Sequence, residues 1–106
     1  MKSYELSSIY GKNKKGYYGK AIVIEDESGN LFLQSYSTIV CGIIDGILKR
    51  FWNGYSVTTA QYVNDFAIQN GFGGGLSKKE WESILVESCP IHPINNNYKI
   101  AEHYTL

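Results

Sequence analysis

The chain has 106 residues, of which 43% are hydrophobic, and its 10 Lys and Arg balance its 10 Asp and Glu. This length corresponds to about one domain on the usual scale of roughly 100–150 residues. The hydrophobic fraction, which includes 9 Tyr, 4 Phe and 2 Trp, excludes an intrinsically disordered chain. The longest charge-free apolar stretch, residues 38–44, is far shorter than the roughly 20 residues of a membrane helix. We therefore expect one globular domain with no membrane contact.

Charge and cysteine content set further expectations. Zero net charge argues against general coating of nucleic acid. Residues 1–20 nevertheless carry five lysines and one glutamate, so the positive charge is concentrated near the N-terminus. This segment lacks the apolar stretch of a signal peptide, which predicts a cytoplasmic location in a host bacterial cell. Cys41 and Cys89 are too few for a disulfide framework and are expected to be free thiols.

The first hairpin is expected between residues 19–25 and residues 31–36. Both segments are rich in β-branched or aromatic side chains, and residues 28–30 between them have the composition of a turn. The acidic run at residues 25–27 predicts a solvated tip that discourages aggregation.

Asp45 and Gly46 predict a second hairpin, because both central positions of a two-residue turn favour positive φ. The implied register pairs Ile44 with Ile47 and continues to Ile39 with Trp52. One face would then hold Ile39, Cys41, Ile43, Leu48, Arg50 and Trp52, and the other Val40, Gly42, Ile44, Ile47, Lys49 and Phe51. Since both faces are largely apolar, we expect a central hairpin, or helices on one face and a partner on the other.

Two short helices are expected next. Ser56 or Thr58 caps a first helix that ends at Asn70 and Gly71. The capping box of Ser77 and Glu80 opens a second helix.

The inward side chains of this second helix are expected to be Trp81, Ile84 and Leu85, and residues 98–104 are expected to form a last edge strand. The expected fold is one α+β domain over residues 1–106. It has an antiparallel β-sheet of three to five strands with two short α-helices packed on one face.

Several short segments resemble a small uncharacterised domain of bacteriophage and mobile-element proteins. They are residues 36–38, 45–46, 54–59, 63–66 and 76–81, and the resemblance covers Leu31 to Ile84, about half of the chain. Members often have a histidine where this chain has Tyr62, so the resemblance carries over no titratable group. It implies a phage or mobile-element setting, in which many small proteins disable a host defence complex. Anti-CRISPR proteins are the best-known type.

Residues 10–20 interleave cations, aromatic rings and glycines. The candidate binding residues are Lys12, Lys14, Lys15, Tyr17, Tyr18 and Lys20. Lysines neutralise phosphates, and exposed tyrosines stack on bases or pack on a protein. The segment therefore predicts contact with a protein or with nucleic acid. The alternative is a solvated loop that leads into the first strand.

Arg50, Trp52 and Tyr55 form a second candidate site, because these residue types dominate binding hot spots. The alternative is that Trp52 fills the core while Arg50 lies along it with its charged head in solvent.

No metal or cofactor is expected. Cys89 and His92 form one close ligand pair, with His103 and Cys41 elsewhere, whereas structural zinc sites usually have two such pairs. The same cysteines and histidines could act as a nucleophile and its base, but the chain has no nucleophile elbow. It is therefore not expected to be an enzyme.

The expected function is direct, non-enzymatic inhibition of a host protein or ribonucleoprotein complex, with a Cas effector as the leading target. The alternative is a small phage protein that contacts nucleic acid through its Lys- and Tyr-rich loop. The sequence is also compatible with a homodimer.

Overall fold

The computed structural model describes residues 1–7, 20–73 and 75–94. The expected strand at residues 98–104 lies outside the described residues. So do Lys12, Lys14, Lys15, Tyr17 and Tyr18 of the predicted binding loop.

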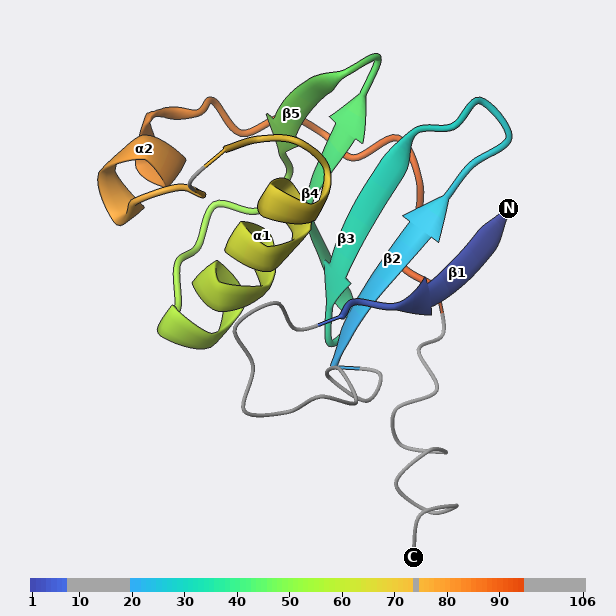
Figure 1. Ribbon diagram of the computed structural model, residues 1–106, viewed down its shortest axis with the longest axis horizontal. Coiled ribbons are helices and arrows are strands. Elements are labelled where there is room, and N and C mark those ends of the chain that lie inside the picture. Colours follow the sequence, from blue (N-terminus) through green and yellow to red (C-terminus); the bar gives the residue numbers. More distant parts are fainter. Residues whose placement is uncertain (8–19, 74, 95–106) are drawn as a thin grey trace, which may run out of the picture.

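Five antiparallel strands form one sheet in which each strand pairs with its neighbours along the chain (Figure 1). They are β1 (Lys2–Glu5), β2 (Ala21–Glu25), β3 (Leu31–Ser35), β4 (Thr38–Ile44) and β5 (Ile47–Arg50), followed by helices α1 (Val57–Gln69) and α2 (Lys78–Ser83). This arrangement confirms the predicted α+β fold. Strand β1 was not predicted, because all four of its residues are exposed and only one is a large apolar side chain.

The β4–β5 hairpin has the predicted turn. Asp45 and Gly46 have φ angles of 52° and 78°, and the observed pairs run from Ile44 with Ile47 to Cys41 with Arg50. Both turn residues therefore adopt the left-handed conformation that such a turn requires.

A β-bulge makes the predicted faces wrong at the start of β4. The β3–β4 register shifts between Leu33 and Gln34, so that Leu33 pairs with Cys41 whereas Gln34 pairs with Ile39. Val40 is the extra residue of the bulge. It joins Cys41 in the core beneath the helices, whereas Ile39 lies in the core of the opposite face.

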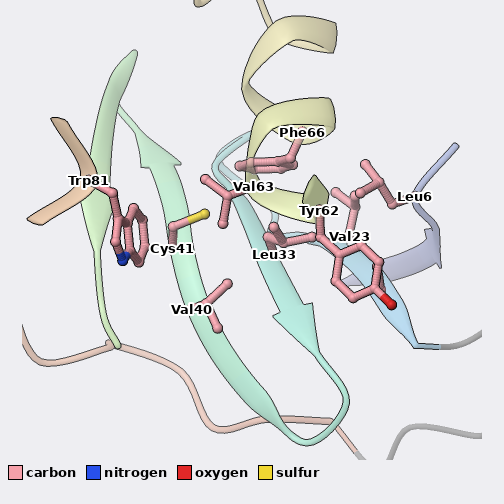
Figure 2. Packing of buried hydrophobic residues seen from close by; sticks show 10 residues of the cluster. Leu6, Val23, Leu33, Val40, Cys41, Tyr62, Val63, Phe66 and Trp81 are labelled. Atoms are coloured by element: carbon pink, nitrogen blue, oxygen red, sulfur yellow. The ribbon is translucent and has the colours of Figure 1, made fainter. Parts of the chain in front are cut away.

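The larger core lies between the helices and the sheet. Figure 2 shows Tyr62, Val63 and Phe66 of α1 against the side chains of the sheet, with Trp81 of α2 beside β4 and β5. Its buried members are Leu6, Ala21, Val23, Leu33, Val40, Cys41, Tyr62, Val63, Phe66 and Trp81. Both helices thus contribute to one core on the same face of the sheet. Burial of this apolar surface is the main stabilising contribution to such a fold.

The opposite face of the sheet is covered by the chain's own residues 89–94, which cross behind the strands in Figure 1. Cys89, Ile91 and Ile94 pack there on a second core of Ile22, Ile24, Phe32 and Ile39. A partner is therefore not needed to cover this face, contrary to one of the two expectations above.

The buried amide of Gln34 fixes residues 89–94 to β3. Its Nε2 donates to the carbonyl oxygens of Tyr36 (2.9 Å) and Ile94 (3.1 Å), and its Oε1 accepts from the Ile94 N–H (2.9 Å). The Gln34 side chain is completely buried, and each of its polar atoms has a partner.

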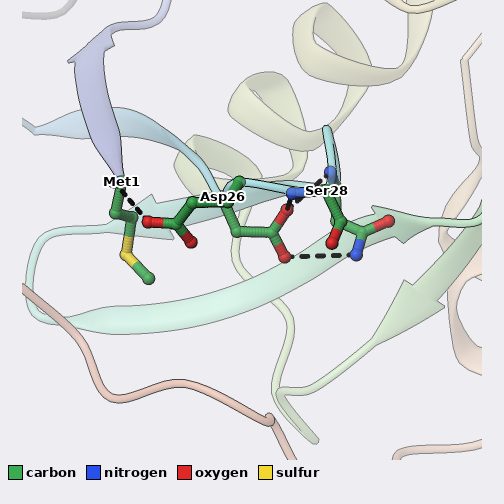
Figure 3. Close-up of polar contacts among 5 residues, drawn as sticks. Met1, Asp26 and Ser28 are labelled. Atoms are coloured by element: carbon green, nitrogen blue, oxygen red, sulfur yellow. Dashed lines mark hydrogen bonds and ion pairs between the residues drawn. The ribbon is translucent and has the colours of Figure 1, made fainter.

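The acidic tip of the β2–β3 hairpin is an ordered turn (Figure 3). Asp26 Oδ1 accepts from the N–H groups of Ser28 and Asn30, both at 2.9 Å, and the Met1 ammonium contacts Glu27 at 2.8 Å. Desolvation acts to raise the pKa of Asp26, but the hydrogen bonds from Asn30, Ser28 and Gly29 outweigh it and lower the pKa below its usual value.

Both helices begin at the expected caps. Ser56 caps α1 by accepting from the Thr59 N–H, and α1 ends at Gln69 with Asn70 as its C-cap. Ser77 and Glu80 form the predicted capping box of α2, whose Trp81 is buried. The prediction that Leu85 points inward is wrong, since α2 ends at Ser83 and Leu85 is 84% exposed.

Candidate binding site: an aromatic groove beside the start of α1

The linker between β5 and α1 is held at two backbone carbonyls. Arg50 Nε donates to the Trp52 carbonyl oxygen at 2.8 Å, and the indole Nε1 of Trp81 donates to that of Gly54 at 2.9 Å. Ser56 then begins the helix. Contacts from β5 and α2 therefore position the linker residues Trp52 and Tyr55.

Close packing of Trp52 on Gly54 fixes the indole ring. A Cβ added at Gly54 would lie 2.3 Å from Cζ2 of Trp52 and 2.5 Å from its Cε2, which is much closer than van der Waals contact. Only glycine lets the backbone come this near to the ring. The orientation of Trp52 thus depends on the absence of a side chain at residue 54.

These contacts shape a groove of about 320 Å³ between residues of the β3–β4 turn and of the start of α1. It is lined by Ser35, Tyr36, Thr38, Val40, Trp52, Tyr55, Ser56 and Thr59. These residues supply three aromatic rings and several hydroxyl groups, and none carries a formal charge. We call this the aromatic groove.

Tyr36 reaches the groove from a strained turn. Its φ angle is 56°, in the left-handed region that costs a non-glycine residue about 1–2 kcal/mol. The turn is held on both sides, because the Tyr36 N–H donates to the Lys20 carbonyl oxygen (2.8 Å) and the Tyr36 carbonyl accepts from Gln34. Strained residues of this kind concentrate at functional sites.

A buried polar contact joins the two walls of the groove. The hydroxyl oxygens of Ser35 on β3 and Thr59 on α1 lie 3.2 Å apart, and both residues are buried. This hydrogen bond sets the spacing between the sheet and the helix where the groove opens.

Arg50 lies behind the groove and is 95% buried, since its relative exposure is 5%. Beyond its contact with Trp52, its Nη1 donates to the carbonyls of Trp81 and Ile84, both at 3.2 Å, and its guanidinium lies 4.8 Å from the Trp81 ring. The expectation that its charged head lies in solvent is wrong. The structure makes Arg50 a support of the site.

The structure places the other predicted residues as follows. Trp52 and Tyr55 both line the groove, and Tyr55 is 37% exposed. Lys20 is exposed and borders the Tyr36 turn through the backbone hydrogen bond described above. Tyr36 was not predicted as a site residue. A two-residue Tyr-Ser turn without glycine was the signal in the sequence that could have identified it.

Lys78 of α2 lies against Tyr55, one of the residues that line the groove. Its Nζ lies 5.2 Å from the centre of the Tyr55 ring, in a cation–π arrangement.

The two thiols lie on opposite faces of the sheet and are free. Burial raises the pKa of the fully buried Cys41 thiol. It also raises the pKa of Cys89, which is only partly buried and whose thiol is hydrogen-bonded by the backbone of Ile91, a contact that acts in the opposite direction. Among the described residues, no three His, Cys, Asp or Glu side chains lie together as metal ligands would. In the same part of the chain, neither helix combines the length and the hydropathy that a membrane crossing requires.

Fold and site together define a class of small α+β protein in which an antiparallel meander carries an aromatic groove at the start of its longer helix. The chain belongs to a family of unknown function (DUF8033), whose sequence pattern matches residues 4–83. Comparison with curated proteins and with solved structures finds no match. The family description assigns no activity and names no genomic setting.

Proposed function

We propose that this protein is a non-enzymatic inhibitor that docks on a macromolecular complex through the aromatic groove. In keeping with the resemblance of residues 31–84, the proposed setting is a phage or mobile element. The proposed target is a host defence complex, with a Cas effector first among the candidates, and the proposed place of action is the host cytoplasm.

The observation that carries the proposal is the convergence of Tyr36, Trp52 and Tyr55 on one groove with fixed walls. Tyrosine and tryptophan are enriched at binding hot spots because they bury a large area at a low cost in conformational entropy. The contacts at Gly54 and Arg50 hold Trp52 in place before any partner arrives. Such preorganisation raises affinity by removing an ordering cost.

Inhibition of DNA cleavage by a panel of purified Cas effectors tests the proposal. We expect the parent protein to inhibit at least one effector. Tyr55→Ala should weaken inhibition by about 10- to 100-fold, the loss typical of a hot-spot residue. The matched control is Tyr4→Ala, which removes an exposed tyrosine from β1 at the other edge of the sheet. Full inhibition by Tyr55→Ala would contradict the role of the groove.

A second set of variants tests the basic segment, which lies outside the described residues. Changing Lys12, Lys14 and Lys15 together to Glu should leave the melting temperature nearly unchanged, because exposed charges contribute about 0–1 kcal/mol each. If this segment takes part in docking, inhibition falls. The alternative function, contact with nucleic acid through this segment, predicts oligonucleotide binding that weakens steeply as salt is raised.

A further inference from the structure

We infer that the aromatic groove binds a proline-rich peptide segment in the polyproline II conformation. This inference rests on the proposed function, because it specifies which kind of segment of a partner protein the groove would recognise. Such a segment is an extended left-handed helix whose backbone carbonyls are free to accept hydrogen bonds, and each proline lacks a backbone N–H. The lining of the groove suits a ligand with these properties.

The walls of the groove are aromatic and uncharged. Three aromatic rings and Val40 provide its apolar surface, and no lining residue carries a formal charge. Grooves lined by aromatic rings are the usual binding sites of proline-rich segments, whose rigid rings pack between them. A nucleic acid strand would instead bring one negative phosphate per nucleotide to walls that offer no cation. The lining therefore favours a neutral peptide.

Several residues that line the groove have hydrogen-bond donors to offer. Within residues 1–7, 20–73 and 75–94, the indole N–H of Trp52 and the hydroxyls of Tyr55 and Thr38 make no hydrogen bond. Tyr55 and Thr38 are exposed residues. Trp52 is half-buried, and since every buried polar side-chain atom in that part of the chain has a partner, its indole N–H is accessible. All three groups can therefore donate to the carbonyl oxygens of a ligand.

The acceptors of the lining are largely used within the protein. The Ser56 hydroxyl oxygen accepts from the Thr59 N–H at 3.1 Å, and the hydroxyls of Ser35 and Thr59 bond to each other at 3.2 Å. No carboxylate or side-chain amide lines the groove. An ordinary peptide would bring backbone N–H groups to a site with few acceptors, whereas proline has no such N–H. The balance of donors and acceptors thus selects a proline-rich segment.

A second groove adjoins the first at Tyr55, which lines both. It has a volume of about 450 Å³, and its other lining residues all belong to α1, among them Val57, which is 79% exposed. A polyproline II helix repeats every three residues and rises about 3.1 Å per residue, so side chains three positions apart lie on the same face. A segment with this repeat can therefore place one proline on each side of the Tyr55 ring.

Fluorescence anisotropy with three labelled probes tests the inference. The first probe is a twelve-residue peptide of four Pro-Pro-Ala repeats built from L-amino acids. The second is the same peptide built from D-amino acids, which keeps the composition but reverses the hand of the helix, and the third is a twelve-residue oligothymidine. We expect saturable binding of the L-peptide alone. The inference would be overturned by no binding of the L-peptide, by equal binding of the two peptides, or by preferred binding of the oligothymidine.

Variants of the protein locate the binding and test the donor role. Tyr55→Phe removes a hydroxyl and keeps the ring, so it should weaken binding of the L-peptide by about threefold to tenfold, the loss expected of one hydrogen bond, and leave the melting temperature unchanged. The matched control is Tyr4→Phe, which removes a hydroxyl from β1 at the other edge of the sheet and should bind like the parent protein. Equal binding by these two variants would overturn the inference.

Val57→Ser tests the second groove. It removes apolar surface from the first turn of α1 and should weaken binding of the L-peptide about twofold or more. Binding equal to that of the parent protein would overturn the continuation of the ligand past Tyr55. Circular dichroism verifies that every variant is folded.

The cleavage assay separates this inference from the proposed function. If Tyr55→Ala abolishes inhibition of a Cas effector but the L-peptide does not bind, the choice of ligand is wrong and the groove remains the docking site. If the L-peptide binds and no effector is inhibited, the specificity for proline-rich segments stands and the proposed target is wrong.

Discussion

Replacing Gln34 with leucine tests whether one buried amide holds residues 89–94 on the sheet. Leucine is similar in size to glutamine, so the substitution removes the polar atoms with little change in packing. It deletes three hydrogen bonds, one to Tyr36 and two to Ile94. It also leaves the N–H and carbonyl of Ile94 without their side-chain partner.

The expected cost follows from these bonds. A hydrogen bond contributes about 0.5–1.5 kcal/mol net, and a buried group left unsatisfied costs about 1–3 kcal/mol. The groups released on Ile94 and Tyr36 are only partly buried, so water can replace part of each interaction. Leucine also avoids the desolvation cost of the amide. We therefore expect the free energy of unfolding to fall by about 2–3 kcal/mol, which corresponds to a decrease in melting temperature of about 10–20 °C.

Urea denaturation followed by tryptophan fluorescence measures the global effect, and labelling of Cys89 by a thiol reagent measures the local one. Cys89 packs within residues 89–94 on the second core, so its labelling should accelerate in Gln34→Leu. Cys41 is buried in the core beneath the helices, so it should not be labelled while the protein is folded. The matched control is Gln61→Leu on the exposed side of α1, with an expected change within about 0.5 kcal/mol. If Gln34→Leu has the same stability and the same rate of Cys89 labelling as the parent protein, the amide does not hold residues 89–94 on the sheet.

Three shorter predictions concern the turn, the thiols and the acidic groups. Gly46→Val should destabilise the fold by about 1–2 kcal/mol in urea denaturation, because a β-branched residue resists the φ angle of 78°; unchanged stability would contradict the turn. Reducing agent should change neither mass nor melting temperature, because the sheet separates Cys41 from Cys89; a mass increase of two hydrogens would contradict this. Hydrogen bonds from Ser77 lower the pKa of Glu80, and the net effect at Asp26 is also a lower pKa. The folded state therefore binds fewer protons, and the melting temperature should fall as the pH drops from about 5 to about 3. Glu80→Gln should flatten this dependence.

Local signals in the sequence predicted much of the fold. The Asp45-Gly46 turn and the Ser77–Glu80 capping box depend on a few adjacent residues, and the structure confirms both. Strand β1 escaped prediction because its sequence, Lys-Ser-Tyr-Glu, lacks an apolar alternation. Its place in the sheet depends on pairing with β2, about 20 residues further along the chain. Long-range pairing of this kind leaves little trace in a short polar segment.

The site was only partly predictable for a similar reason. Trp52 and Tyr55 were expected on residue type, and the structure brings them to one groove. Tyr36 joins them only because the bulge at Val40 and the amide of Gln34 fix the β3–β4 turn. The burial of Arg50 depends on carbonyls 31 and 34 residues away, which no spacing rule reveals.

The order of the strands has a consequence for the folding kinetics. Because each strand pairs with its chain neighbours, most of the sheet forms by closing short loops, which is the topology of rapidly folding domains. The contact of Gln34 with Ile94 instead closes a loop of 60 residues. The entropic cost of closing this loop is offset only once β3 has formed and residues 89–94 can pack on it. We therefore expect residues 89–94 to dock last during folding and to exchange their amide hydrogens first from the native state.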